Sequence, residues 1–176
     1  YYLIKSPKIY LCIFSGNINQ NSFYGHSHND RLSVELVLNG TNHALMDPGS
    51  YIYTPDIKMR NLFRNLSVHN TVNFFNNDKV IQMLDWFPGS KGTFSLIGNV
   101  KTALISYEDL KLDSEGNPLN NPQITFECYY KNLIHQRQIK IFNDSIKIID
   151  RSNQEFSFKP NNFNYYSNGY GKLIET

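Results

Sequence analysis

Charge and cysteine are both scarce in this sequence. Charged residues make up 18% of the 176 residues and the net charge is +2, so charge alone indicates no nucleic acid or other polyanion as a partner. The two cysteines, Cys12 and Cys128, form no Cys-x-x-Cys pair, which argues against a thiolate zinc site. Both lie in alternating apolar runs, and this favours buried free thiols over a disulfide.

Several motifs of common enzymes and membrane proteins are also missing. We find no Gly-rich phosphate loop, no nucleophile elbow, no signal peptide and no apolar run long enough to span a membrane. Nothing points to the paired carboxylates of a glycosidase. The length and composition fit one globular domain over residues 1–176.

Aromatic residues and alternating apolar segments are abundant. Aromatic residues make up 14% of the chain, which favours strands. Apolar residues alternate with period two in "RLSVELVL", "QITFECYY" and "RQIKIFNDSIKIID". Turn residues separate these segments, as at "LNGTN" and "DPGS". The sequence therefore predicts an all-β fold, an antiparallel β-sandwich.

One segment near 55–66 breaks the strand pattern. In "TPDIKMRNLFRNL", Thr54 suits the N-cap, Pro55 suits the first helical position, and apolar residues follow at helical spacing. We expect one short helix there. Arg60 and Arg64 would share one of its faces. They form either a solvated basic face or a clamp for a carboxylate or sulfate group.

Histidines and aspartates gather around the alternating segment "RLSVELVL". His26, His28 and Asp30 precede it at every second position and would share one face if the strand begins early. The turn at "NGTN" brings Asp47 back towards their level, and His69 leads into the next strand-like run. His28, Asp47 and His69 would supply two imidazoles and a carboxylate, a suitable zinc ligand set with an open fourth position. A hydrogen-bonded polar cluster without metal is the alternative.

A His-x-His motif on a β-sandwich also occurs in cupins. In that family a Glu follows the second His more closely than Glu35 follows His28 here, and the second cupin motif is missing. A cupin-like metal enzyme is therefore a weaker alternative.

The order of these short motifs resembles the heparinase II/III-like family of polysaccharide lyases. The resemblance covers about residues 24–74 and rests on "GHSHND", a strand, a Gly turn, "DPGSYIY", an Arg-bearing segment and "HNTV". Each piece is short, and their common order and spacing carry the resemblance. The rest of the chain agrees with it in being rich in strands.

The resemblance implies a function and a set of ligands. Members of the family cleave uronic-acid polysaccharides by β-elimination, between an N-terminal (α/α) toroid and C-terminal β-sandwich material. A divalent metal, usually zinc, is held by the second His of His-x-His, the Asp of Asp-Pro-Gly and the His of His-Asn-Thr. These correspond to His28, Asp47 and His69. The metal would brace the site rather than activate water.

The resemblance also implies residues that meet the substrate. The first His of the motif, His26, would face the substrate. Tyr51 and Tyr53 are the local candidates for a tyrosine in acid–base chemistry, with a structural tyrosine packed on the sheet as the alternative for each, and we select Tyr53 as catalytic. Arg60 and Arg64 become candidate contacts for a substrate carboxylate or sulfate. In the family the principal tyrosine comes from the toroid, so we expect this chain alone to be inactive.

The expected whole is the β-sandwich domain of a polysaccharide lyase, part of a longer protein whose N-terminal toroid is absent here. The family implies an acidic polysaccharide as the substrate and a periplasmic or secreted location. A non-catalytic carbohydrate-binding or structural sandwich is the other alternative.

Overall fold

Strands dominate the computed structural model of the protein. The structure describes residues 1–19, 24–53, 55–86, 96–143, 145–158, 165–169 and 171–175. All strand pairs in these residues are antiparallel. The prediction of an all-β antiparallel fold is therefore confirmed.

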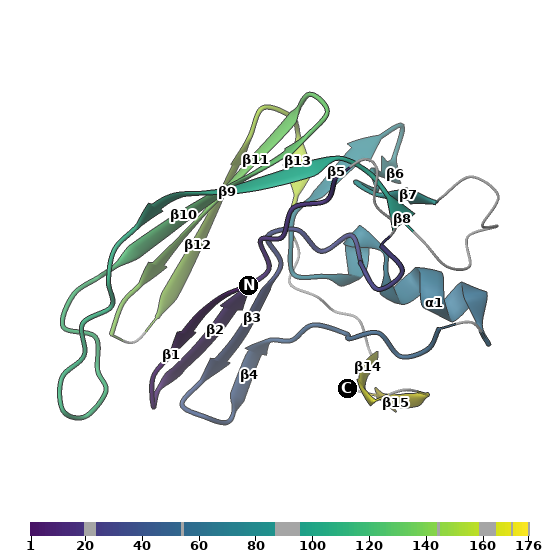
Figure 1. The fold of residues 1–176 in the computed structure, drawn as a ribbon. Coiled ribbons are helices and arrows are strands. Elements are labelled where there is room, and N and C mark those ends of the chain that lie inside the picture. The colour runs from purple at the N-terminus through teal and green to yellow at the C-terminus, as the bar shows by residue number, and fades with distance from the viewer. Residues whose placement is uncertain are drawn as a thin grey trace.

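Two four-stranded sheets form the body of the fold (Figure 1). The first has the order β1-β2-β3-β4 and consists of β1 (Tyr2–Lys5), β2 (Ile9–Ile13), β3 (Val34–Leu38) and β4 (Asn42–Leu45). The second has the order β12-β11-β10-β9 and consists of β9 (Val100–Tyr107), β10 (Gln123–Tyr130), β11 (Leu133–Ile141) and β12 (Ile146–Ser152). Each is an up-and-down arrangement, in which neighbours along the chain also pair in space.

The hydrophobic core lies between the two sheets. Every second residue of β2 and of β11 is buried, as expected for strands with one face towards a core. Leu11 and Val34 from the first sheet belong to the same cluster as Phe126 and Ile139 from the second. This shared cluster makes the two sheets a sandwich. Cys12 and Cys128 are free thiols, as predicted, but only Cys128 is buried, whereas Cys12 is half-buried.

Shorter strands extend the sandwich at one end (Figure 1). A three-stranded sheet has the order β13-β5-β6, with β5 (Asn73–Asn76), β6 (Lys79–Val80) and β13 (Phe156–Ser157). Two further pairs join β7 (Asp85–Trp86) to β8 (Leu96–Ile97) and β14 (Tyr165–Gly169) to β15 (Lys172–Glu175). Among the described residues, no helix is long and apolar enough to cross a membrane.

The predicted helix is present but starts later than expected. Helix α1 spans Ile57–Phe63, and its N-cap is Asp56, whose side chain accepts a hydrogen bond from the backbone N–H of Met59 at 3.0 Å. The expected cap, Thr54, lies outside the described residues. Asp56 can cap because its carboxylate reaches the free N–H groups of the first turn. A 3-10 helix, η1 (Leu66–Val68), follows α1.

Candidate active site

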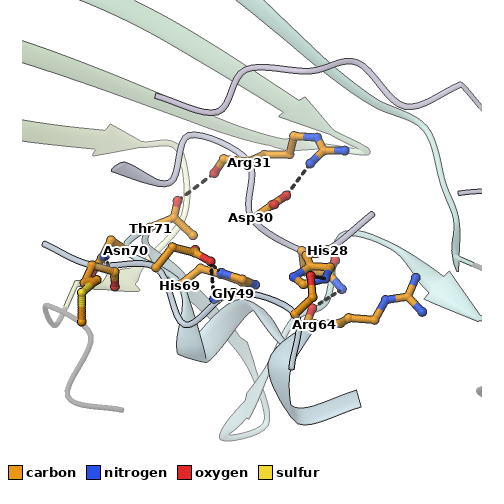
Figure 2. Close-up of polar contacts among 12 residues, drawn as sticks. His28, Asp30, Arg31, Gly49, Arg64, His69, Asn70 and Thr71 are labelled. Carbon is orange, nitrogen blue, oxygen red and sulfur yellow. Dashed lines mark hydrogen bonds and ion pairs between the residues drawn. The ribbon is translucent and has the colours of Figure 1, made fainter. Parts of the chain in front are cut away.

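Three irregular segments meet at one end of the first sheet (Figure 2). They are residues 24–33 before β3, residues 46–53 after β4, and residues 69–72 before β5. The expected strand face through His26, His28 and Asp30 does not form, because β3 begins only at Val34. The three side chains therefore have separate surroundings: His26 is exposed, His28 is buried and Asp30 is half-buried.

Asp47 and His69 form a short, partly buried hydrogen bond. His69 is 1% exposed, and its Nδ1 lies 2.6 Å from Asp47 Oδ2. Burial alone would lower the pKa of His69, but the Asp47 carboxylate outweighs it and raises that pKa. Burial would likewise raise the pKa of Asp47, but His69 and the Gly49 N–H, 2.9 Å from Asp47 Oδ1, lower it. Because Asp47 is thus held ionised, it accepts and His69 Nδ1 donates.

His28 lies beside this pair as a neutral imidazole. Its ring centroid is 5.4 Å from that of His69, and its Nε2 lies 3.4 Å from Ser50 Oγ. Burial, assisted by the neighbouring His69, lowers the pKa of His28 to about 3. At neutral pH its ring nitrogens therefore keep a lone pair for hydrogen bonding or for a metal ion.

The chemistry of this cluster fits zinc, while its present geometry is that of a hydrogen-bonded pair. Two imidazoles and an ionised carboxylate are typical zinc ligands. Nε2 of His69 is buried without a hydrogen bond of regular geometry, although the backbone of Phe63 lies close enough to help raise the pKa of His69. Within the described part of the chain, however, no three His, Cys, Asp or Glu side chains are arranged to hold a metal. If Nδ1 of His69 and Oδ2 of Asp47 both bound one zinc, they would lie about 3.3 Å apart, so their 2.6 Å contact would have to open.

His26 and Tyr53 meet at the surface next to this cluster. The Tyr53 hydroxyl lies 3.1 Å from His26 Nδ1, and the two rings meet edge to face with centroids 5.2 Å apart. The Arg60 guanidinium stacks on the Tyr53 ring at 4.3 Å. Tyr51, the other tyrosine of the loop, instead packs on Phe63 with ring centroids 5.3 Å apart. The structure thus brings together the two residues predicted to be catalytic.

Arg60 and Arg64 are buried, so the alternative of a solvated basic face is wrong. Each is 1% exposed. Arg60 Nη2 donates to the Gly25 carbonyl at 2.6 Å, and Arg64 Nε donates to the Ser27 carbonyl at 2.8 Å. Burial, together with the charge of Arg60, lowers the pKa of Arg64 to about 9. Both guanidinium groups hold the segment that carries His26 and His28, and their contact with substrate stays a prediction.

Asp30 pairs with its neighbour and not with the histidines. Its Oδ1 accepts from Arg31 Nη1 at 2.5 Å, and the Arg31 guanidinium lies 4.4 Å over the Phe14 ring. Burial raises the pKa of Asp30 to about 6 despite the opposing charges of His69 and Arg31. A cavity of about 100 Å³ nearby is lined by Asp30, Glu35 and Asp47 among others. The glutamate of the cupin alternative thus lines this cavity, to which neither His26 nor Tyr53 contributes.

Two polar residues that the sequence reading missed tie the three segments together (Figure 2). Asn70 Nδ2 donates to the Met46 carbonyl at 2.9 Å, and Thr71 Oγ1 donates to the Arg31 carbonyl at 2.8 Å. Asn70 and Thr71 are both fully buried. The signal was present in "HNTV", because an Asn-Thr pair at the start of a buried strand needs hydrogen-bond partners.

The comparison with protein families agrees with this site. The family described as heparinase II/III-like, C-terminal, matches residues 1–155. The chain belongs to this family. The match includes both four-stranded sheets and every predicted site residue. No curated protein and no solved structure matches the chain. As a heparinase II/III-like chain, it is a member of a polysaccharide lyase family.

Proposed function

We propose that this chain forms one wall of the active site of a lyase that cleaves uronic-acid polysaccharides by β-elimination. The observation that carries the proposal is the exposed pair of His26 and Tyr53, joined at 3.1 Å. The two residues belong to the same two segments as His28 and Asp47. Membership of the heparinase II/III-like family supports the reaction type.

The pair suits the two proton transfers of an elimination. A base removes the proton at C5 of the uronate. The electron pair of the broken C5–H bond then forms a double bond between C5 and C4 as the C4–O bond breaks. The departing oxygen then takes a proton, so the sugar loses none overall. Tyr53, after giving its hydroxyl proton to His26, would accept the C5 proton. The same pair would return a proton to the leaving oxygen.

The substrate carboxylate needs a cationic or hydrogen-bonding partner, because negative charge develops next to it as the C5 proton leaves. Of the two predicted arginines, Arg60 is better placed for this role. It stacks on Tyr53, and its Nη1 has no hydrogen bond. Because Arg60 is only 1% exposed, substrate binding would have to uncover it. Arg64, by contrast, donates to the Ser27 and Tyr24 carbonyls at 2.8 and 3.2 Å.

We also propose that zinc or another divalent cation binds His28, Asp47 and His69. Its chemical contribution would be a fixed positive charge that cross-links the segments before β3, after β4 and before β5. The neutral state of His28 and the ionised state of Asp47 support this assignment. In this role the cation braces the segments from which His26 and Tyr53 project.

Three further parts of the proposal rest on the family alone. The opposite wall of the site would be an (α/α) toroid in the full-length protein, the polymer would be acidic, and the protein would act in the periplasm or outside the cell. A chain that contributes one wall would be inactive by itself.

The test is a screen of the full-length protein against heparin-like, alginate-like and O-antigen polymers. The unsaturated uronate product absorbs ultraviolet light, so its appearance in the wild type and its loss in Tyr53→Phe would support the lyase function. If no polymer yields this product while one of them binds, the chain is a non-catalytic carbohydrate-binding sandwich instead.

A further inference from the structure

A single buried arginine of the second sheet reaches both histidine-bearing segments. Arg137 of β11 is fully buried, and its Nη1 donates to the carbonyls of Leu32 and Asn70 at 2.6 and 2.7 Å. Leu32 lies on the segment that carries His28, and Asn70 directly follows His69. One nitrogen atom therefore links the two segments across the interior of the sandwich.

Arg137 is itself held by a buried carboxylate. Its Nε and Nη2 donate to the two oxygens of Asp150 on β12, at 2.7 and 3.0 Å. His135 Nε2 lies 2.7 Å from the same carboxylate, and Arg137 and Asp150 are direct cross-strand partners. Such a forked contact fixes the plane of the guanidinium, so Nη1 points out of the second sheet in a defined direction.

The backbone at Leu32 is bent in a way that serves this contact. Leu32 has φ +58, a left-handed conformation that costs about 1–2 kcal/mol for a residue with a side chain. Its N–H donates to the Phe14 carbonyl at 2.8 Å, while its carbonyl accepts from Arg137. Val34 N–H also donates to the Asn70 carbonyl, at 3.3 Å. An uncommon conformation kept in the core indicates a functional requirement at this point.

Stability alone does not explain a buried arginine here. The same face of β11 carries Leu133, Ile139 and Ile141, all buried, and replacing a buried ion pair by apolar residues is often neutral or stabilising. An apolar residue at 137 would pack, but it could not donate to two carbonyls at once. The feature that only an arginine supplies is the link between the two segments.

We infer that Arg137, oriented by Asp150, is a positioning residue that sets the spacing of His28 and His69. The role in catalysis and in cation binding rests on the proposed function, whereas the role in the geometry of the two histidines does not. Without Arg137, the two segments would be joined only by bonds such as those from Thr71 to the Arg31 carbonyl and from Val34 to the Asn70 carbonyl. The separation of the two histidines would then be less firmly fixed.

The experiment compares Arg137→Met with Ile139→Ala in the full-length protein. Ile139 is a buried neighbour on the same face of β11, so its truncation destabilises the core without touching the link. We expect Arg137→Met to lower zinc affinity and kcat by about 10- to 100-fold, as for other residues that orient ligands, with little change in KM. Ile139→Ala should lower the melting temperature but leave zinc affinity and kcat unchanged. Arg137→Lys, which keeps one donor, should recover part of the loss.

A second measurement does not depend on activity or on metal. In the metal-free protein, the side-chain nitrogen resonances of His69 report its hydrogen bond to Asp47. They should shift in Arg137→Met and stay in place in Ile139→Ala. If Arg137→Met does not fold, Asp150→Asn, which keeps the arginine but loosens its anchor, should show the same changes at smaller size.

The inference is overturned if the histidine resonances, zinc affinity and kcat of a folded Arg137 or Asp150 variant equal those of the wild type, or if Ile139→Ala shows equal losses. A wild-type protein without lyase activity would refute the proposed function instead. In that case the resonances of His69 would still decide the role of Arg137.

Discussion

Tyr53 and His26 are hydrogen-bonded to each other across two chain segments that flank the β3–β4 hairpin, with the phenol oxygen 3.1 Å from Nδ1. The hairpin itself supplies no catalytic group. Its contribution is to return the chain, so that the loop after β4 lies beside the segment before β3. The pair is half exposed, whereas the neighbouring His28 and His69 are buried. The residues proposed for proton transfer are thus accessible to solvent, while the two histidines proposed to bind the metal are buried.

Removing the Tyr53 hydroxyl should abolish most of the activity of the full-length protein and leave its fold intact. In Tyr53→Phe the ring that stacks under Arg60 is kept, while the proton-transfer group is lost. We expect kcat on a uronate polymer to fall about 10²- to 10⁴-fold, with an unchanged melting temperature. The matched control is Tyr51→Phe, whose ring packs on Phe63. Activity that survives Tyr53→Phe but not Tyr51→Phe would show that the wrong tyrosine was chosen.

Zinc should stabilise the wild-type protein and not the Asp47→Asn variant. A ligand that binds only the folded state, at a concentration a hundred times its Kd, adds about 2.7 kcal/mol to the free energy of unfolding. Asn at position 47 keeps a hydrogen-bond acceptor but loses the charge of the carboxylate. Thermal unfolding with and without zinc measures the difference. Glu35→Gln, a change to another carboxylate that lines the same cavity, should keep the zinc effect. If zinc stabilised the wild type, Asp47→Asn and Glu35→Gln equally, the metal would bind at another site.

Local patterns were enough to predict the elements and the short-range parts of the site. The period-two runs predicted the strands, and the turn at "NGTN" explains why Asp47 returns towards the level of His28 and Asp30, since β3 pairs with β4 on both sides of that turn. The exposure of side chains before β3 could not be predicted. The expected strand face of His26 and His28 requires extended backbone, and the left-handed Leu32 interrupts it.

Long-range partners were the part that sequence patterns could not supply. Arg137 sits at an alternating position of β11, on one face with His135 and Ile139, so the pattern predicts only that it faces the core. Its contact with Leu32 joins residues 105 positions apart, which depends on how the two sheets pack. The same holds for Arg60 and Arg64. Their spacing on a helix is visible in the sequence, but their carbonyl partners are fixed by tertiary packing.

The metal-free protein should lose stability in mild acid because of His28. Its folded-state pKa is about 3, below the value of about 6.5 expected in the unfolded chain. As pH falls from about 6.5 to about 3, the unfolded state takes up a proton that the folded state does not, so the free energy of unfolding decreases. His28→Gln removes this contribution. Its stability curve, measured by denaturant unfolding, should therefore fall less steeply than that of the wild type over this range.

A matched control for the pH experiment is His43→Gln, because His43 is an exposed residue of β4. His69 contributes with the opposite sign. Its pKa is raised in the folded state, so its stabilising contribution is present below about 6.5 and is lost as pH rises through the folded value. Because the wild type and His28→Gln both contain His69, its contribution cancels when their stability curves are compared. Parallel curves for the wild type and His28→Gln would mean that His28 is not buried as a neutral imidazole.

Arg64 should prove more important for stability than for substrate affinity. Arg64→Ala removes the donors to the Ser27 and Tyr24 carbonyls, and each lost hydrogen bond from a charged group costs about 1.5–3 kcal/mol. We therefore expect a clear drop in the melting temperature and disorder of the segment that carries His26 and His28. The control is Lys58→Ala, an exposed cation of the same helix, which should change neither. If Arg64 instead binds the substrate carboxylate, Arg64→Ala would raise KM without loss of stability. That result would support the substrate clamp predicted from the spacing of Arg60 and Arg64. It would also mean that the hydrogen bonds of Arg64 to the two backbone carbonyls are not needed for stability.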